Sequence, residues 1–247
     1  LLLYHLDRIT ENGMLNDGIN TIKSIGPKKQ QSFNKMGIYT VEDMLGFYPR
    51  MYEDRTNFKK ICELTDGETA LIKACAVTVV KNNRVRHGLS LQKVRVTDGT
   101  GVAEITWFNK DWLPSNFDIS ADYCYFGTVK IKGHTVTISN PIYEPADNPK
   151  QTNKIMPLYP LTSGLTQNVV QFAASECVKL AADLPETIPD FIREKFTLCG
   201  RDYAVSNIHF PADARHLAYA RRRLAFEELF YLQLAMRLIR RRNTDIN

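Results

Sequence analysis

Two aromatic residues and a set of cations give this sequence its clearest binding chemistry. Phe108 ends a run rich in Val, Ile and Thr, and Trp112 follows four residues later. Several cationic side chains accompany the two rings, namely Arg84, Arg86, Lys93, Arg95 and Lys110. Flat rings stack on nucleobases and cations follow phosphates, so the combination predicts a surface for single-stranded nucleic acid. Each ring could instead pack under a loop of its own domain.

The elements that must position these side chains are β-strands. Five runs rich in Val, Ile, Thr and aromatic residues follow one another at short spacing, and turn residues separate most of them. We expect strands at 69–81, 89–97, 101–108, 122–132 and 134–140. Asp98-Gly99 is the sharpest hairpin signal among the turns. The pattern predicts a small five-stranded β-barrel.

Strand parity places Phe108 outside this barrel. Side chains alternate between the two faces of a strand, so Ile105 and Trp107 share one face, which we expect to be the core. Phe108 then lies on the other face with Glu104 and Thr106. A large ring is therefore left near solvent at the end of a strand.

The preceding run, 89–97, needs an irregularity if its apolar residues are all to face the core. Leu89 and Leu91 are out of phase with Val94 and Val96. We therefore expect a bulge near Gln92 or Lys93, beyond which Lys93 and Arg95 point outward. A barrel with a basic outer face and exposed rings is typical of OB-folds that bind single-stranded nucleic acid.

Composition restricts the class of protein. With 247 residues, 44% hydrophobic and 24% charged, the chain has room for more than one globular domain. The net charge of +5 is mild, but cations cluster along the chain, which favours an acidic partner. The five cysteines are widely spaced without metal-ligand spacing, which is typical of a reduced cytoplasmic protein. No apolar run approaches a membrane span, and we expect no metal site, no catalytic residue and no membrane partner.

An N-terminal pair of helices is expected between residues 17 and 55. Gly26-Pro27 opens the first helix and Gly37 closes it. Thr40 and Asp43 form a capping box for a second helix at 41–47. The pair is similar to a helix-hairpin-helix motif, in which the backbone at Gly26 would approach phosphate. The alternative is that the pair only packs against its neighbours.

The C-terminal part is expected to be helical after an extended segment with five prolines between 141 and 160. We expect helices at 167–182, capped by Thr166, at 191–196 and at about 213–242. The last helix should pack through an apolar seam, and its arginines could contact phosphate or form a solvated face. The seam consists of Ala225, Leu229, Leu232, Met236 and Ile239. His209 and His216 have no metal-ligand spacing and are interpreted as structural.

These elements predict an α+β chain of four parts. They are an N-terminal helical region at 1–60, the barrel at 61–145, a Pro-rich linker with short helices at 146–210, and a long basic helix at 211–247.

A family resemblance rests on motifs that occur in order along the chain. The first are Ile25-Gly-Pro-Lys28, Met36-Gly-Ile-Tyr-Thr-Val-Glu-Asp-Met-Leu45 and Tyr48-Pro-Arg-Met-Tyr-Glu-Asp-Arg55. The later ones are Val96-Thr-Asp-Gly-Thr-Gly101, Trp107-Phe-Asn109, Asn140-Pro-Ile-Tyr143, Leu158-Tyr-Pro-Leu-Thr162, Ile208-His-Phe-Pro211 and Ala220-Arg-Arg-Arg-Leu-Ala-Phe-Glu-Glu-Leu229. Together they resemble the N-terminal part of the RecG family of ATP-dependent DNA helicases, over about residues 20–240.

The resemblance implies a wedge domain that splits the arms of stalled replication forks and recombination junctions. Phe108 and Trp112 occupy the places of two family aromatics that stack on bases at the branch point. The second of these is more usually Tyr, so Trp112 is a departure that keeps an aromatic face. The resemblance also implies partners, namely branched DNA and the C-terminal helicase domains of the same protein.

No phosphate loop of the form Gly-x-x-x-x-Gly-Lys-[Ser/Thr] occurs in this sequence. ATP and Mg²⁺ would therefore belong to a motor that follows Asn247, and we expect no ATP hydrolysis by this chain alone. Two alternatives are a stand-alone OB-fold module for single-stranded nucleic acid and a protein-interaction scaffold. A tRNA-binding OB-domain is also conceivable, although nothing in the sequence indicates an aminoacylation core.

Overall fold

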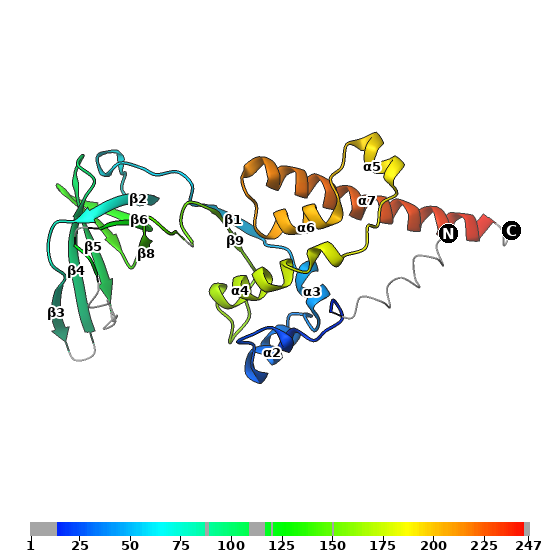
Figure 1. The fold of residues 1–247 in the computed structure, drawn as a ribbon, viewed down its shortest axis with the longest axis horizontal. Helices are drawn as coiled ribbons and strands as arrows, with labels where there is room; N and C mark the ends of the chain where they lie inside the picture. Colours follow the sequence, from blue (N-terminus) through cyan, green and yellow to red (C-terminus); the bar gives the residue numbers. More distant parts are fainter. Residues whose placement is uncertain (1–13, 87–88, 109–116, 120, 150, 245–247) are drawn as a thin grey trace. The chain divides into compact units, whose positions relative to one another are not determined.

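The computed structural model describes residues 14–86, 89–108, 117–119, 121–149 and 151–244. The chain divides into two compact units. The strand unit is Asp54–Met156, and the helical unit combines Leu1–Glu53 with Pro157–Asn247. Most strands lie in the first unit and the helices longer than one turn lie in the second (Figure 1). The expected α+β class is confirmed.

One sheet forms the strand unit. Within the described residues its strands are β2 (Thr69–Ala76), β3 (Lys81–Arg86), β4 (Leu89–Thr97), β5 (Val102–Phe108), β6 (Asp122–Lys132), β7 (Thr135–Ser139) and β8 (Ile142–Pro145). Neighbouring strands follow the order β2-β4-β5-β7-β6-β8, with a further pairing of β2 with β6, and β3 pairs with β4. All these pairs are antiparallel except β5 with β7. A short helix, η3 (Ile61–Glu63), precedes β2.

Four of the five expected strands are found within a residue or two of their predicted bounds. The fifth expected run, 69–81, ends as a strand at Ala76, and the basic segment from Lys81 forms a separate strand, β3. β3 and β8 were not expected, because they contain Lys, Asn and Pro, which have low strand propensity. Both segments form strands by pairing with a neighbouring strand.

The core of the strand unit confirms the parity of β5. Ile105 and Trp107 are fully buried, with Val94 and Val96 of β4 beside them. The bulge expected near Gln92 or Lys93 is wrong, because β4 and β5 pair without interruption from Leu91↔Phe108 to Thr97↔Val102. Gln92 is buried in phase with the valines, and Leu91 lies on the outer face instead.

The helical unit contains the other elements of the described chain. They are η2 (Ile19–Thr21), α2 (Pro27–Asn34), α3 (Val41–Gly46), α4 (Gln167–Val178), η4 (Ala181–Asp183), α5 (Asp190–Phe196), α6 (Arg201–His209) and α7 (Ala214–Thr244). A separate two-stranded sheet pairs β1 (Met51–Asp54) with β9 (Ile155–Leu158). The expected helices are all present, and α6 is an addition.

The helix caps agree with expectation at α3 and differ at α4. The amide of Asp43 donates to Thr40 Oγ1 over 3.1 Å, and the amide of Thr40 donates to Asp43 Oδ2 over 2.9 Å. The predicted capping box is therefore confirmed. Thr166 precedes α4 as expected, but its side chain accepts no cap hydrogen bond, so that prediction is wrong.

Packing of the helical unit uses the expected face of α4 and an unexpected face of α7. Val170, Ala173, Cys177 and Ala181 are all buried, as their spacing predicts. The seam predicted for α7 is wrong, because Leu229, Leu232 and Ile239 are 61%, 54% and 60% exposed.

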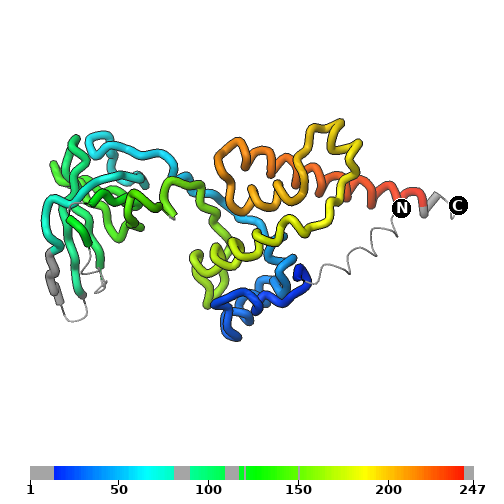
Figure 2. The backbone as a smooth tube through the Cα atoms, viewed as in Figure 1, coloured from blue at the N-terminus to red at the C-terminus, as the bar shows by residue number. Residues whose placement is uncertain are grey.

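The face of α7 that does pack belongs to its first half. Leu217 and Ala220 are buried with Ala204 and Ile208 of α6, and Leu224 packs against them. α6 and the first half of α7 accordingly run side by side (Figure 2). Periodicity identified residues on a common face of α7, but not the face that a neighbour covers.

His209 is a structural histidine of the helical core, as the sequence predicted. Its Nε2 lies 2.9 Å from the carbonyl oxygen of Leu45, which can only accept, so Nε2 carries the proton. Nδ1 then accepts from the hydroxyl of Tyr159 over 2.7 Å. Burial lowers the pKa of His209 to about 4, and the bond to Leu45 opposes that shift.

This burial predicts a stability that falls in mild acid. An unfolded imidazole has a pKa of about 6.5. The unfolded chain therefore binds the proton between the two pKa values while the folded chain does not. We expect the free energy of unfolding to fall by about 2 kcal/mol from pH 7 to pH 5 through this group. Urea titrations of the wild type and of His209→Gln test this, because the variant should lose that part of the slope. Equal pH dependence in the two proteins would contradict it.

Candidate nucleic-acid interface

Phe108 is the exposed ring at the end of β5. Its side chain is 41% exposed, although the flanking Trp107 is fully buried. Its backbone N–H donates to Asn140 Oδ1 over 3.0 Å, and the backbone N–H of Asn140 donates to the carbonyl oxygen of Thr106 over 2.7 Å. Asn140 directly follows β7, and its two hydrogen bonds fix the backbone at the C-terminal end of β5. Phe108 lies outside the core, as parity predicted.

Asn140 is a supporting residue that the sequence placed in a family motif, without a role at the site. It has a φ of 47°, in the left-handed region that Asn tolerates better than most residues. Its position between the end of a strand and Pro141 was the available signal, because Asn before Pro favours a turn. Its two backbone-directed hydrogen bonds show what that turn does.

An aromatic cluster lies behind Phe108, on the core side of the sheet. Trp107 packs edge-on against Tyr143 with ring centroids 5.2 Å apart. Phe117 stacks on Tyr123 at 4.6 Å, and the amide of Asp118 donates to the Tyr123 hydroxyl over 3.1 Å. The cluster therefore fixes the chain on both sides of 109–116. Trp112 and Lys110 lie in that segment, outside the described residues.

The two predicted cations of β4, Lys93 and Arg95, differ in whether a carboxylate already pairs with them. Lys93 Nζ lies 2.6 Å from Oε1 of Glu104, a residue of the neighbouring strand β5. Arg95 is exposed on the same outer face, opposite Glu104. Both side chains point outward as expected, but the ion pair neutralises much of the charge of Lys93. Arg95 is the cation of β4 with more charge available for phosphate.

Arg84 and Arg86 belong to β3, which pairs with the first half of β4. Arg84 is opposite Ser90 and Arg86 is opposite Leu89, with a register shift between the two arginines. The sequence analysis expected strands at 69–81 and 89–97, which left both arginines in the loop between them; the structure places them on a strand instead. Their strand pairs with the part of β4 that extends from Leu89 to Lys93.

Gly26 lies at the N-terminus of α2 and has an ordinary extended conformation, with φ at −83° and ψ at 175°. A Cβ atom built there would meet nothing within 4 Å. The fold therefore does not require glycine at this position. Whether Gly26 approaches phosphate stays a prediction.

Gly26→Val separates the two roles of this position. Because the site is open, the variant should unfold within about 0.5 kcal/mol of the wild type. If the backbone at Gly26 contacts phosphate, the added side chain should weaken binding to a duplex arm by several-fold. Fluorescence titration of labelled duplex, beside a urea titration, measures both quantities. Unchanged duplex affinity would assign the helix pair to packing alone.

The arginines near the start of α7 are largely engaged inside the helical unit. Arg223 is fully buried, and its guanidinium donates to Glu186 and Glu227 over 2.6 Å each. Arg221 stacks over the ring of Tyr52 at 4.9 Å, and Arg222 donates to the carbonyl oxygen of Phe196 over 2.7 Å. Arg223 therefore cannot contact phosphate.

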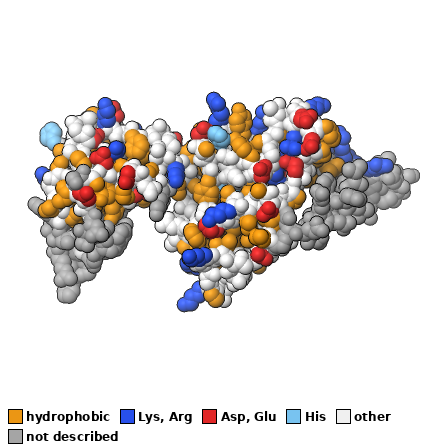
Figure 3. All heavy atoms as spheres, viewed as in Figure 1, with side chains coloured by type: hydrophobic (Ala, Val, Ile, Leu, Met, Phe, Trp, Pro, Cys, Tyr) orange, Lys and Arg blue, Asp and Glu red, His pale blue; other side chains and the backbone are white. Residues whose placement is uncertain are grey.

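Surface charge on the molecular face of Figure 3 is mixed. Lys and Arg side chains are interspersed there with acidic and hydrophobic ones, and no single basic field covers either unit on that face. On that face, an anion would meet local groups of cations and not one continuous basic surface.

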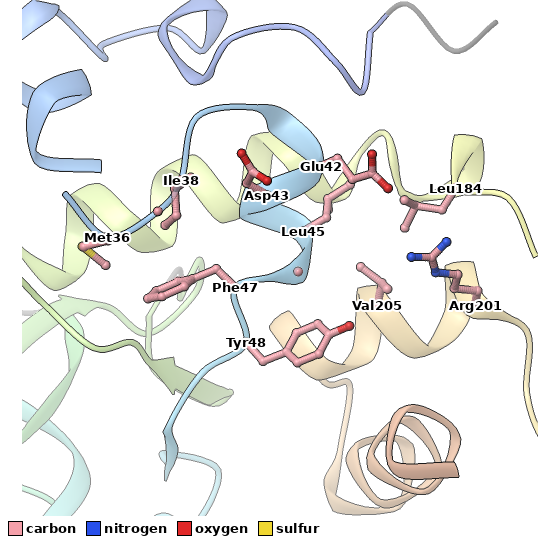
Figure 4. A pocket seen from close by; sticks show the side chains of 12 residues that line it. Met36, Ile38, Glu42, Asp43, Leu45, Phe47, Tyr48, Leu184, Arg201 and Val205 are labelled. Carbon is pink, nitrogen blue, oxygen red and sulfur yellow. The ribbon is translucent and has the colours of Figure 1, made fainter. Parts of the chain in front are cut away.

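A cavity of about 450 Å³ opens beside α3 in the helical unit (Figure 4). Apolar side chains from α3 and α6, including Leu45 and Val205, form part of its wall. Two of its polar groups are already used within the fold, since Asp43 caps α3 and Arg201 donates to the carbonyl oxygen of Pro185 over 3.0 Å.

Across the described residues, no group of three or more His, Cys, Asp or Glu side chains is placed to hold a metal ion. Within the same part of the chain, none of the helices is long and apolar enough to cross a membrane. All five cysteines are free thiols.

Comparison with known proteins identifies relatives along most of the chain. A family model described as the RecG wedge domain matches residues 18–180. The ATP-dependent DNA helicase RecG of Thermotoga maritima is 33% identical over 97% of this chain and 31% of its own length. The RecG of Synechocystis sp. is 31% identical over 89% of this chain and 28% of its own length.

A solved structure gives the same relationship in three dimensions. The structure of RecG bound to a three-way DNA junction matches 94% of this chain and 32% of its own, with a TM-score of 0.84 and 33% identity. The chain thus spans about a third of the length of these relatives. Since the wedge model alone covers well over half of its residues, the chain belongs to the RecG wedge domain family.

Proposed function

We propose that this chain is the branched-DNA-binding part of a RecG-type DNA helicase that remodels stalled forks and recombination junctions. The observation that carries the proposal is the likeness, over 94% of the chain, to a RecG structure bound to a three-way DNA junction. An exposed ring at the end of a strand, flanked by outward cations, fits that role. Such an activity would belong in the cytoplasm.

The strand unit would act as an OB-type barrel of five strands. The pairings β2-β4-β5-β7-β6, with β6 returning to β2, and the parallel pair β5–β7 support that description. In an OB-fold the second and third barrel strands carry the ligand. These correspond to β4 and β5, which hold Lys93, Arg95 and Phe108.

At the branch, Phe108 and Trp112 would stack on the first unpaired bases. A stacked base replaces water over an apolar ring, and every base has such a face, so the contact is independent of sequence. Arg84, Arg86, Arg95 and Lys110 would contact phosphates, with a smaller contribution from Lys93 because of Glu104. Phosphate contacts position the DNA, and the rings distinguish a branch from a uniform duplex.

The motor that uses ATP and Mg²⁺ would lie in the C-terminal helicase domains of the same protein. The relatives are about three times as long as this chain, which supports further domains. The exposed apolar residues of α7, Leu229, Leu232 and Ile239, suit contact with such domains. The chain alone should bind DNA without hydrolysing ATP.

A competition experiment tests the proposed function. We expect a three-way fork to displace labelled fork DNA more effectively than a matched duplex or a plain single strand, at one fixed salt concentration. Equal competition by the plain single strand would favour a stand-alone single-strand-binding module. Absence of DNA binding at low salt would favour an interaction scaffold.

The salt dependence of fork binding should report the phosphate contacts. If about four phosphates are neutralised, log K should fall against log salt with a slope of roughly −3 to −4. Arg84→Ala with Arg86→Ala should flatten that slope by about one to two units. Lys154→Ala with Lys179→Ala is the charge-matched control and should leave it unchanged. An unaltered slope in the arginine variant would place the contacts elsewhere, with α7 as the next candidate.

A further inference from the structure

The outer face of the β6–β7 hairpin carries exposed cations that the proposed site does not use. Val129 and Ile138 are cross-strand partners and are fully buried. Because side chains alternate, the neighbouring pair Lys130↔Thr137 lies on the opposite, outer face. Lys132 pairs with Thr135 two residues further on, and both lysines are exposed.

The strand register places Lys130 in the same cross-strand row as Arg95 of the proposed site. Arg95 is opposite Glu104, Glu104 is opposite Thr137, and Thr137 is opposite Lys130. The four residues therefore form one row across the outer face of β4, β5, β7 and β6. The row begins and ends with a cation and has a hydroxyl group next to Lys130.

The net charge of this row is positive. Its carboxylate, Glu104, is held by Lys93 at 2.6 Å, and Asp122 near the start of β6 is held by Lys73 at 3.1 Å. Asp66 lies near the end of β6, where it accepts the amide of Ile131 over 2.7 Å. Among the residues that the structure describes, Arg95, Lys130 and Lys132 have no acidic partner. Their charge is therefore available to an anion.

We propose that this row and Lys132, hereafter the β6–β7 track, bind the sugar–phosphate backbone of one single strand after it leaves the branch at Phe108. The proposal rests on the proposed function and extends it. From Phe108 to Glu104 is four residues along β5, about 13 Å, and from β5 to β6 is two strand spacings, about 10 Å. A few unpaired nucleotides beyond the stacked bases can cover that distance, within the roughly 4–16 nucleotides that an OB-fold accommodates.

The chemistry of the track suits a backbone and not bases. Exposed Lys130 and Lys132 provide point charges for phosphate, and Thr137 provides a hydroxyl group that can donate to a phosphate oxygen. No exposed aromatic ring belongs to the row, so bases have no stacking partner on it. Binding along the track should be sequence-independent and salt-sensitive.

The test measures how the wild type and one double-lysine variant bind two different forks. One fork has an arm of about ten unpaired nucleotides, and the other has duplex arms only. Lys130→Ala with Lys132→Ala should flatten the salt slope on the first fork by about 0.7 per lysine, so by about 1.4 in total. The slope on the fully duplex fork should not change. Lys154→Ala with Lys179→Ala removes the same charge elsewhere and should behave as the wild type on both forks.

A conservative variant and the wild type separate the possible failures. Lys130→Arg with Lys132→Arg keeps both charges and should retain the wild-type slope. If the alanine pair leaves the slope on the single-stranded arm unchanged while the wild type still prefers forks over duplex, the track is wrong and the proposed function stands. Equal flattening on both forks would also overturn the track, because it would indicate duplex contact. If the wild type shows no fork preference, the proposed function fails and the track with it.

Discussion

Replacing Phe108 and Trp112 together by alanine is expected to weaken binding to a three-way fork by about 2–6 kcal/mol. Each ring should contribute about 1–3 kcal/mol by stacking on an unpaired base. Binding to a matched duplex should barely change, since it depends on phosphate contacts. Affinities for the two DNAs, measured at one salt concentration, give the difference directly.

The fold should tolerate this change at Phe108. The Phe108 ring is already partly in solvent, and the hydrogen bond to Asn140 uses its backbone and not its ring. Phe58→Ala is a matched control, because Phe58 is another exposed ring of the strand unit, at 45%. Circular dichroism should show all variants folded. Equal losses on fork and duplex would mean that the rings support a general surface.

The second large effect is on stability, at Arg223. This guanidinium is fully buried and donates to both Glu186 and Glu227. Burial alone would raise the pKa of Glu186, but the amide of Ile188 and the charge of Arg223 hold it below its usual value. Arg223→Met would leave both carboxylates without this cation. We expect a loss of about 3–5 kcal/mol in the free energy of unfolding.

Urea titration measures that loss, with two comparison variants. Arg222→Met removes a neighbouring cation that donates to the carbonyl oxygen of Phe196 at an exposed position, and it should cost about 1 kcal/mol or less. Adding Glu186→Gln and Glu227→Gln to Arg223→Met should recover part of the loss, because it removes two negative charges whose other cations, Arg193 and Arg201, lie 3.6 and 3.9 Å away. A loss below about 1 kcal/mol for Arg223→Met would show that the buried ion pairs do not stabilise the helical unit.

Local patterns predicted the elements that carry the site. The alternation in β5 placed Trp107 inside and Phe108 outside, because a strand buried on one face leaves its side chains no other choice. The capping box of Thr40 and Asp43 was readable for a similar reason, since both partners lie within one turn. The spacing of Val170, Ala173 and Cys177 likewise identified the packed face of α4.

Predictions failed where the outcome depended on a distant partner. Leu91 was assigned to the core for being apolar, yet Gln92 is buried because β4 stays in phase with β5. Arg223 looked like a surface cation within a run of arginines, and only the fold brings Glu186 to it from 37 residues away. The spacing of Leu229 and Leu232 did define one face of α7. It could not show that no described residue covers that face.

We propose that the two rings stack on bases at the branch, and one fluorescence measurement tests this stacking most directly. A fork carrying 2-aminopurine as its first unpaired base should lose fluorescence when the wild-type chain binds at saturation, because stacking on an aromatic ring quenches that base. Phe108→Ala with Trp112→Ala, saturated at higher concentration, should leave the base bright, whereas Phe58→Ala should quench it as the wild type does. Equal quenching by the wild type and the double variant, or none by either, would contradict the stacking of these rings at the branch.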